Sequence, residues 1–395
     1  MMDGKKIIRN TLFMLCTFMC LFACAKPVKA ENSAITGTDN NPEAAQEMLV
    51  SVYFLRAGKA DSILIHTENH SYLIDTGTEG SLSCIFGALH MLQIEKLDAV
   101  FCTHTHNDHI GGLDGVLRNI PVETVYRSEI SENNKKGINK IDKKAGREVT
   151  TLKAGDTIPV EKGICFEVLG PLVESTVGDN DNSLVLKMTV GNIRYLFTGD
   201  MQFAEEQTLL ERGTDLKADV LKIGNHGNPD ATSGPFAEAV APKYCVVTTD
   251  RTVDADSANP LVLARFPDAK IYCTDETEQG ILFTQIDNGS ITVTEPFRKG
   301  EKDFSSLELT HTERVLILEN GGKEQNLSGC MLSTESGEAF FCFPDGTILK
   351  NGESITISGE KDDGDFVVPG KKPFKEKKGR LLLFDEYGNP VREFD

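Results

Sequence analysis

Four side chains that can bind metals fall within one short segment of this sequence: His104, His106, Asp108 and His109. Imidazole and carboxylate groups are the ligands that zinc-like metals use. Ionisable groups this close together repel one another or lose hydration unless a cation collects them. The chain has 8 histidines in all, so chance is a poor explanation for a segment that gathers three of them. The segment therefore predicts a metal site.

The flanking residues indicate how the chain holds this segment. The preceding run, Leu97–Cys102, is largely apolar with β-branched and aromatic residues, which is typical of a buried strand. Gly111 and Gly112 follow, so we expect the histidines on a tight turn at the strand's carboxyl end. Residues i and i+2 of an extended segment point the same way, so His104 and His106 can share one metal. The residues past the bend can face a second metal.

Three more polar residues stand beside glycine at the ends of predicted strands. Asp75 precedes a Thr-Gly pair, Asp200 follows one, and His226 lies between Asn225 and Gly227. Polar residues at such positions commonly build sites, although a single aspartate before a turn is more often only a turn former. Their order along the chain, together with the histidine-rich segment, is what makes them specific.

This ordered series resembles the metallo-β-lactamase superfamily, and more closely the extracellular hydrolase domain of the ComEC competence family. The resemblance covers residues 48–298 and includes the stretches 54–61, 181–186, 197–200 and 274–282. It implies an αββα sandwich, of fold class α/β (α+β), with the metal ions at one edge of the paired sheets.

The resemblance also implies two divalent metal ions, Zn²⁺ or alternatively Mn²⁺, and a metal-activated water as the nucleophile. The implied ligands are His104 and His106 for one ion, Asp108, His109 and His226 for the other, and Asp200 between them. Asp75 would orient the ligands from behind. Asp108 and Asp75 are the residues implied in catalysis.

Two residues next to His226 are candidate substrate contacts, Lys222 and Asn225. Lys222 could reach a substrate phosphate. The alternative is a lysine that covers apolar surface and extends its ammonium into water.

The chain departs from the family pattern at several positions. It has no histidine between His109 and His226, so the usual third imidazole of the first site is missing, as is typical of ComEC-like domains. Oxygen ligands that could replace it are Asp179, Asn180 and Asp181. Asn225 stands where ComEC-like chains usually carry histidine. Fewer imidazoles weaken the preference for zinc and would admit manganese.

The N-terminal residues predict export. Residues 1–30 combine a basic start with a short apolar core and small residues, as in a signal peptide. Cys24 follows Leu-Phe-Ala, so lipid anchoring at that residue is an alternative to free secretion. The apolar core is shorter than the roughly 20 residues a membrane span needs, so we expect no transmembrane helix in the mature chain. Residues 31–47 are polar and predict a flexible linker.

The rest of the chain divides by composition. Strand and helix patterns alternate through residues 48–298, whereas residues 312–395 show only short strands between Gly, Asn and Asp turns, after a predicted linker at 299–311. The C-terminal part resembles the lamin-tail domain, a small all-β immunoglobulin-like sandwich, through motifs at 316–322, 326–330 and 343–346. The resemblance suggests a tether to the cell envelope.

These observations favour a secreted metal-dependent hydrolase, above all a phosphodiesterase or nuclease. The net charge of −19 argues against general binding of polyanions. Two lysine-rich stretches, at 135–147 and 371–380, could still guide nucleic acid. The alternatives are a hydrolase of another substrate (a cell-wall phosphoester, a lactone or a β-lactam) and a metal-poor binding protein.

Overall fold

Two large sheets form the first and larger part of the structure, a computed structural model. It describes residues 48–133, 136–286, 289–337, 339–360, 362–368, 370–375 and 379–394. The expectations for the signal peptide, for Cys24 and for the linker at 31–47 lie outside these residues. Within them, no helix combines the length and apolar character that a membrane crossing requires.

The first sheet has the strand order β15-β14-β1-β2-β3-β4-β5-β6. Its strands are β1 (Met48–Leu55), β2 (Ile63–Thr67), β3 (Ser71–Ile74), β4 (Leu97–Cys102), β5 (Val122–Ser128), β6 (Thr150–Leu152), β14 (Gly280–Ile286) and β15 (Ile291–Thr294). The four strands from β3 to β6 run parallel. The remaining neighbours pair antiparallel.

The second sheet has the order β13-β12-β11-β10-β9-β8-β7. Its strands are β7 (Thr157–Glu161), β8 (Ile164–Gly170), β9 (Val185–Val190), β10 (Ile193–Phe197), β11 (Val220–Lys222), β12 (Tyr244–Val247) and β13 (Lys270–Cys273). Strands β10 to β13 run parallel. Ligands of sheet proteins usually bind beyond the carboxyl ends of parallel strands, and both sheets present such ends.

An apolar core fills the space between the two sheets. Phe54 and Phe101 from the first sheet meet Phe166 and Phe197 from the second, and none of the four is more than 1% exposed. Ring centroids lie 6.2 Å apart for Phe54 and Phe197, and 5.1 Å apart for Phe101 and Phe166. Burying such a side chain contributes about 1.5–3 kcal/mol, so this layer locks the sheets face to face.

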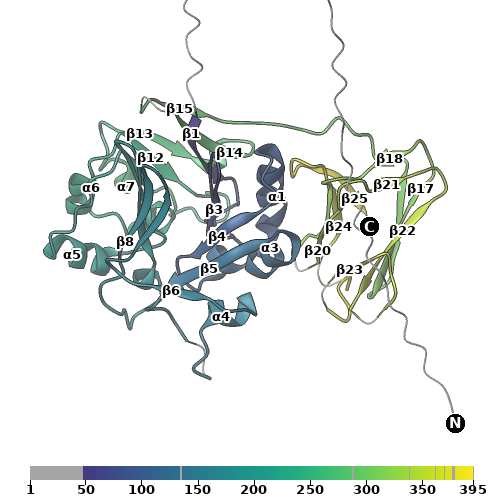
Figure 1. The fold of residues 1–395 in the computed structure, drawn as a ribbon, viewed down its shortest axis with the longest axis horizontal. Coiled ribbons are helices and arrows are strands. Elements are labelled where there is room, and N and C mark those ends of the chain that lie inside the picture. Colours follow the sequence, from purple (N-terminus) through teal and green to yellow (C-terminus); the bar gives the residue numbers. More distant parts are fainter. Residues whose placement is uncertain are drawn as a thin grey trace, which may run out of the picture. The chain divides into compact units, whose positions relative to one another are not determined.

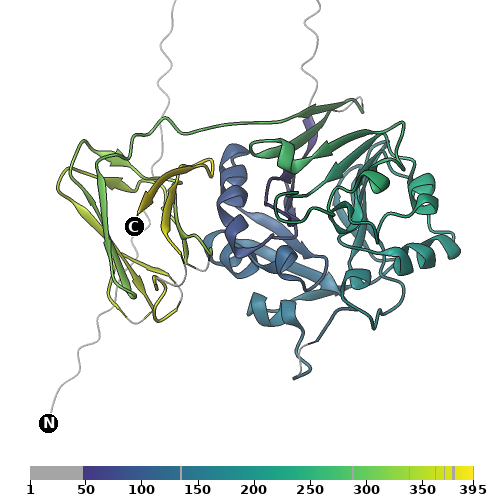
Figure 2. The ribbon, with the colours of Figure 1, turned by 180° about the vertical axis from the view of Figure 1, so that it is seen from behind.

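Helices cover the outer face of each sheet, as Figures 1 and 2 show. The first sheet carries α1 (Leu82–Met91), α2 (Asn107–Ile110), α3 (Leu113–Asn119) and α4 (Lys140–Ala145). The second carries α5 (Phe203–Glu211), α6 (Gly234–Val240) and α7 (Pro260–Leu263). Short 3₁₀ turns are η1 (Glu79–Ser81), η2 (Asn180–Asn182), η3 (Gly224–Gly227) and η4 (Thr274–Glu276). The predicted αββα arrangement is confirmed.

The C-terminal residues form only strands within the part of the chain that the structure describes. One sheet has the order β16-β17-β22-β23, another β20-β19-β24-β25, and β18 pairs with β21. The strands are β16 (Leu307–His311), β17 (Val315–Asn320), β18 (Gln325–Asn326), β19 (Met331–Thr334), β20 (Phe340–Cys342), β21 (Ile348–Leu349), β22 (Ser354–Gly359), β23 (Phe366–Val368), β24 (Leu381–Phe384) and β25 (Pro390–Phe394).

The predicted linker at 299–311 differs from the structure in its second half. Residues Leu307–His311 form β16, which pairs antiparallel with β17. Leu307 is fully buried in the apolar cluster of this region. Alternation of apolar and polar residues over so short a segment is a weak signal, so the strand is defined by its pairing partner rather than by its own composition.

Candidate metal centre

The histidine-rich segment begins where β4 ends, but it is not the simple turn that its glycines predicted. Asp108 and His109 belong to the one-turn helix α2, and Gly111 follows with a helical φ of −56°. A Cβ at Gly111 would lie 2.6 Å from the Cα of Thr78, and one at Gly112 2.5 Å from the carbonyl oxygen of Thr76. The glycines therefore allow the end of β3 to approach this segment closely.

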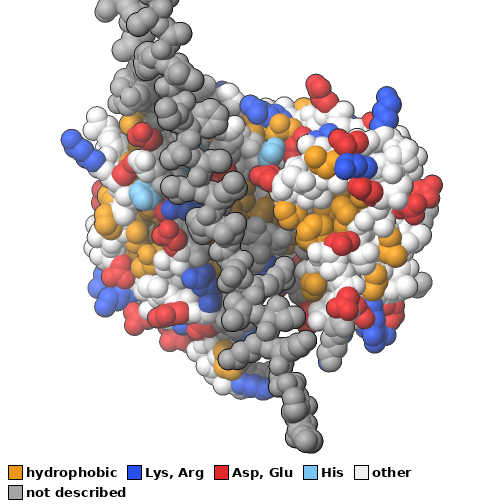
Figure 3. Space-filling model, turned by 45° about the vertical axis from the view of Figure 1, so that its right-hand side comes forward, with side chains coloured by type: hydrophobic (Ala, Val, Ile, Leu, Met, Phe, Trp, Pro, Cys, Tyr) orange, Lys and Arg blue, Asp and Glu red, His pale blue; other side chains and the backbone are white. Residues whose placement is uncertain are grey.

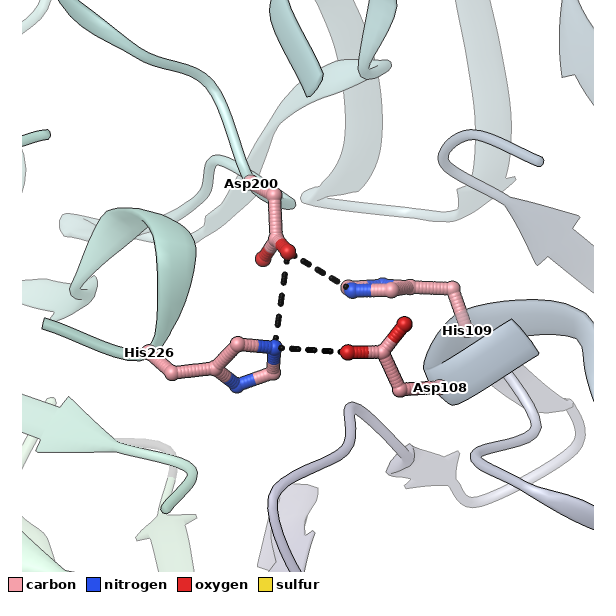
Figure 4. Close-up of side chains that lie close together, drawn as sticks. All are labelled: Asp108, His109, Asp200 and His226. Atoms are coloured by element: carbon pink, nitrogen blue, oxygen red, sulfur yellow. Dashed lines mark ion pairs between the residues drawn. The ribbon is translucent and has the colours of Figure 1, made fainter. Parts of the chain in front are cut away.

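Four of the predicted ligands converge from both sheets: Asp108, His109, Asp200 and His226. The Oδ2 atom of Asp200 lies 3.0 Å from Nε2 of His109 and 3.4 Å from Nε2 of His226. The same His226 nitrogen lies 3.5 Å from Oδ2 of Asp108. Figure 4 shows the four side chains pointing toward one common space.

The other ring nitrogen of each central histidine is anchored from behind. Nδ1 of His109 lies 2.7 Å from a carboxylate oxygen of Asp75. Nδ1 of His226 donates to the backbone carbonyl of Thr248 at 2.8 Å. Such partners define the tautomer and leave the Nε2 lone pairs free for a metal.

His104 and His106 lie beside this group. Nε2 of His104 is 3.0 Å from Nδ1 of His106 and 4.0 Å from Oδ2 of Asp200. Two nitrogen ligands of one tetrahedral zinc ion would lie about 3.3 Å apart. The separation of the two imidazoles is therefore compatible with a shared metal, as the sequence predicts, and Asp200 stands between the two groups.

The donor set fits divalent metal ions. Nε2 of His109 and Nε2 of His226 are buried and have no hydrogen-bond partner, and both face Oδ2 of Asp200. Buried polar atoms are rarely left unpaired. Imidazole nitrogens and carboxylate oxygens that converge in this way are the donors that a zinc-like ion would bind.

The charges in this space act strongly on one another. Burial lowers the pKa of His226, but Asp200 and Asp108 outweigh it and raise that pKa to about 9. For His104, burial and the neighbouring His109 together hold the pKa well below its usual value. The carboxylates thus draw positive charge onto the central histidines, which is the role a bound cation would take over.

Asp75 lies behind the centre rather than in it. Its carboxylate is fully buried and accepts hydrogen bonds from the backbone N–H of Thr103 at 2.7 Å and from its hydroxyl at 2.6 Å. With the contact to His109, each bond ties Asp75 to the segment that starts at the end of β4. The geometry agrees with an orienting role.

The two predicted substrate contacts have protein partners. The Nζ atom of Lys222 lies 2.5 Å from Asp61, and the side chain of Lys222 has no exposed surface. Asn225 adopts a left-handed φ of 42° and donates to Asp230 at 2.9 Å. This placement does not bring Lys222 to the surface, so neither the phosphate-contacting nor the water-reaching alternative describes its position.

The three candidate oxygen ligands differ in their availability. Asp179 uses both oxygens to accept the backbone N–H groups of Thr105 and Glu132, at 2.8 and 2.9 Å. Asp181 accepts the N–H of Gln202 at 2.8 Å. Only the side-chain oxygen of Asn180, among these three residues, is buried without a hydrogen-bond partner.

Sequence reasoning missed Asp61 as a member of this site. Its carboxylate contacts Lys222 and accepts the hydroxyl of Thr248 at 2.5 Å. It lies in the stretch 54–61 that carries the family resemblance, which was the one signal that could have found it. Nearer the surface, Lys59 bridges Asp108 and Asp254, with Nζ 3.9 and 3.5 Å from their carboxylates.

Part of this chain is similar to known proteins. Residues 55–247 match the family model of the metallo-beta-lactamase superfamily. ComE operon protein 3 of Bacillus subtilis (strain 168) is 30% identical over 160 residues, which cover 40% of this chain and 20% of that protein. Competence protein ComA of Neisseria gonorrhoeae is 30% identical over 215 residues, covering 53% of this chain and 28% of that protein.

The comparison with solved structures matches the metallo-beta-lactamase fold protein YhfI from Bacillus subtilis. It is 14% identical, with a TM-score of 0.42, and the match covers 60% of this chain and 100% of that chain. The chain spans 20% and 28% of the two curated relatives. The similarity to these two relatives therefore concerns one region of each longer protein.

Proposed function

We propose that this chain, of which residues 55–247 match the family model of the metallo-beta-lactamase superfamily, is a metal-dependent phosphodiesterase that uses two divalent ions and acts on nucleic acid. The observation that carries the proposal is the convergence of unpaired Nε2 atoms from His109 and His226 on Asp200. The resemblance to ComEC-like hydrolase domains and the relative named for competence support DNA or a related phosphodiester as the substrate.

The chain's own residues prepare the site for this chemistry. Asp75 and the carbonyl of Thr248 hold the rings of His109 and His226 with Nε2 facing inward. Divalent ions held there would supply an activated water near neutral pH and would stabilise charge on the phosphoryl oxygens.

Asp108 is the more exposed of the two carboxylates in this group. Its side chain is 27% exposed, whereas that of Asp200 is 3% exposed. Burial acts to raise the pKa of Asp108, but His226 and His109 hold it below the usual range. Asp108 is therefore an ionised group on the more exposed side of the candidate centre.

The described part of the face shown in Figure 3 offers no simple electrostatic guide for a polyanion. On the face shown in Figure 3, acidic and basic side chains are interspersed. Helix α4 of the first lysine-rich stretch lies near the site, but Lys144 pairs with Glu79 at 3.0 Å and Lys140 with Glu132. Selectivity is therefore expected to come from the site and its loops rather than from net charge.

The first test is metal content by mass spectrometry, combined with turnover of bis-p-nitrophenyl phosphate, DNA and RNA. We expect about two metals per chain and loss of turnover by about a hundredfold or more in Asp108→Ala. Asp114→Ala is the matched control, because Asp114 pairs with Arg118 on the exposed surface of α3. Turnover of a lactone or β-lactam alone would show another hydrolase, and absence of metal would favour a binding protein.

We further propose that the protein is exported, with lipid attachment at Cys24 as the alternative to free secretion. The C-terminal strand region, which resembles a lamin-tail domain, would tether the enzyme to the cell envelope. Fractionation of cells that express wild-type protein or Cys24→Ala distinguishes the two: an anchored protein leaves the membrane fraction in the variant, and a secreted one is found in the medium in both cases.

A further inference from the structure

Lys222 ends β11 directly behind the candidate metal centre, and its ammonium is completely enclosed. Nζ lies 2.5 Å from Oδ2 of Asp61 and donates to the backbone carbonyl of Gly199 at 2.8 Å. It also lies 3.5 Å from Oδ1 of Asp200. A buried lysine is costly unless it is paired, and here its partners include the carboxylate that stands between the two groups of candidate ligands.

Asp61, on the connection between β1 and β2, joins the same unit. Its Oδ1 atom accepts the hydroxyl of Thr248, the residue whose carbonyl holds His226. Its backbone N–H donates to the carbonyl of Asp108 at 3.0 Å, and its own carbonyl accepts the N–H of Gly77 at 2.8 Å. Asp61 and Lys222 therefore link segments from both sheets that end at the metal centre.

The ion pair gives the two oxygens of Asp200 different partners. Oδ1 faces Lys222, whereas Oδ2 faces the Nε2 atoms of His109 and His226. A second cluster with metal-ligand spacing, formed by Asp61, Asp75 and His109, lies beside the first. In that cluster Lys222 already supplies the positive charge.

We propose that Asp61 and Lys222 act as a positioning pair, which reserves Oδ2 of Asp200 for metal and excludes metal from the neighbouring Asp61–Asp75–His109 cluster. The inference rests on the proposed metal centre. Lys222 acts through Asp200, and Asp61 acts through Lys222 and Thr248. Neither residue has a surface from which it could touch a substrate.

The direction in which Co²⁺ affinity changes when Lys222 is replaced distinguishes a positioning role from simple charge repulsion. Removing a positive charge near a cation would, by Coulomb's law alone, tighten metal binding. The loss of a positioning lysine has the opposite effect, because Asp200 can then rotate and Oδ2 is no longer held toward Nε2 of His109 and His226. We expect Lys222→Met to weaken Co²⁺ binding about 10–100-fold, as measured by chelator competition. The visible absorbance of bound Co²⁺ should also change, since it reports coordination geometry.

Asp61→Asn tests the other half of the pair. The variant leaves the ammonium of Lys222 with Asp200 as its remaining carboxylate partner, so the lysine should compete with metal more strongly. The double variant Asp61→Asn/Lys222→Met removes both charges together. We expect its loss of affinity to be smaller than the product of the two single losses, because the two residues act as one unit. Replacing both partners of a buried pair is also the change best tolerated in folding.

Lys187→Met is the matched control. Lys187 is another buried lysine, 5% exposed at its side chain, and it pairs with Asp215 at 3.2 Å on a different face of the second sheet. Its loss should lower thermal stability and leave Co²⁺ affinity and absorbance unchanged. Unchanged or tighter Co²⁺ binding in folded Lys222→Met, while the wild type binds metal, would overturn the inference alone. Failure of the wild type to bind metal would instead overturn the proposed function on which it rests.

Discussion

At the scale of single residues, the candidate centre depends on which imidazole nitrogen faces inward. A histidine ring offers two nitrogens, and only a nitrogen without a proton can bind a metal. His109 is held by Asp75 and His226 by a backbone carbonyl, so the same nitrogen is free in both rings. Removing such a partner should change metal binding without touching a ligand.

Asp75→Asn tests this dependence. In the wild type, the carboxylate of Asp75 accepts two hydrogen bonds from Thr103 and contacts Nδ1 of His109. The variant replaces one of the two accepting oxygens by an NH₂ group, which donates and therefore cannot keep all three contacts. We expect metal affinity to fall about 10–100-fold, as measured by chelator competition, with turnover falling in parallel.

Asp98→Asn is the matched control for this change. Asp98 also contacts a histidine, His70, at 3.1 Å and accepts a backbone N–H from Ser71 at 2.7 Å, but at the opposite end of β4. The metal affinity of the Asp98→Asn variant should equal that of the wild type. An equal loss in both variants would show that the effect of Asp75 is one of general stability.

At the scale of elements, the loops that follow the parallel strands position the ligands through close backbone approach. Gly199, between β10 and Asp200, has a φ of +51°, and a Cβ there would lie 2.8 Å from Ser183 and 3.0 Å from Thr103. These two residues contact His104 and Asp75. The glycine therefore couples the end of β10 to the end of β4.

Gly199→Ala should damage both folding and the site. A side chain at positive φ costs about 1 kcal/mol, and the clash adds to this. Gly191→Ala is the control, since its φ of +57° is similar and a Cβ added there would meet nothing within 4 Å. In urea unfolding we expect about 1 kcal/mol of destabilisation for Gly191→Ala and at least twice that for Gly199→Ala. Only Gly199→Ala should lose metal affinity.

A buried glutamate in helix α5 should make the free energy of unfolding depend on pH. Glu205 is 2% exposed and accepts the backbone N–H of Leu172 at 2.7 Å. Burial, together with Asp181, raises its pKa to about 7 from an ordinary 4.5. The folded state thus holds a proton that the unfolded state releases, so stability must fall as pH rises from about 4.5 to about 7.

Glu205→Gln removes this titration while keeping the acceptor. We expect the wild type to lose up to about 3 kcal/mol of unfolding free energy relative to the variant between pH 4.5 and 8. Urea unfolding of both proteins at several pH values measures the difference between their unfolding free energies. The contributions of other titrating groups are the same in both proteins and cancel in this difference. A difference that does not vary with pH would contradict the shifted pKa.

At the scale of the whole molecule, metal would bind across the two sheets. His104, His106, Asp108 and His109 follow β4 of the first sheet, whereas Asp200 and His226 follow β10 and β11 of the second. A metal ion that joins these ligands would stabilise the folded state alone, because the unfolded chain does not hold them together.

Metal removal should therefore lower thermal stability. A ligand present at a hundredfold excess over its Kd stabilises by about 2.7 kcal/mol. We expect a chelator to lower the Tm of the wild type and added metal to restore it, as followed by circular dichroism. Asp108→Ala should show a smaller shift, and Asp114→Ala the full shift. A wild-type Tm that does not respond to chelator would argue against a tightly held metal.

The elements with a strong local signal could be predicted from the sequence. The strand at Leu97–Cys102 has the predicted bounds. The predicted fold class is confirmed as well. It could be predicted because alternating strand and helix patterns restrict how the layers can be arranged. Helices α2 and α3 were missed, since Gly111 and Gly112 indicate a turn when only local conformation is considered. The two glycines are needed because the backbone of Thr76 and Thr78 lies very close to them, and this approach is visible only in the three-dimensional structure.

The sequence by itself determined which residue types meet at the centre, because the spacing of His104, His106, Asp108 and His109 is local and strand ends carry the rest. The tertiary structure alone decided the environment of Lys222 and the participation of Asp61, which lie far apart along the chain. It also decided that Nε2 of His226 faces the centre, through its bond to Thr248. Charge pairing and tautomer depend on contacts between distant segments, and no local pattern encodes those contacts.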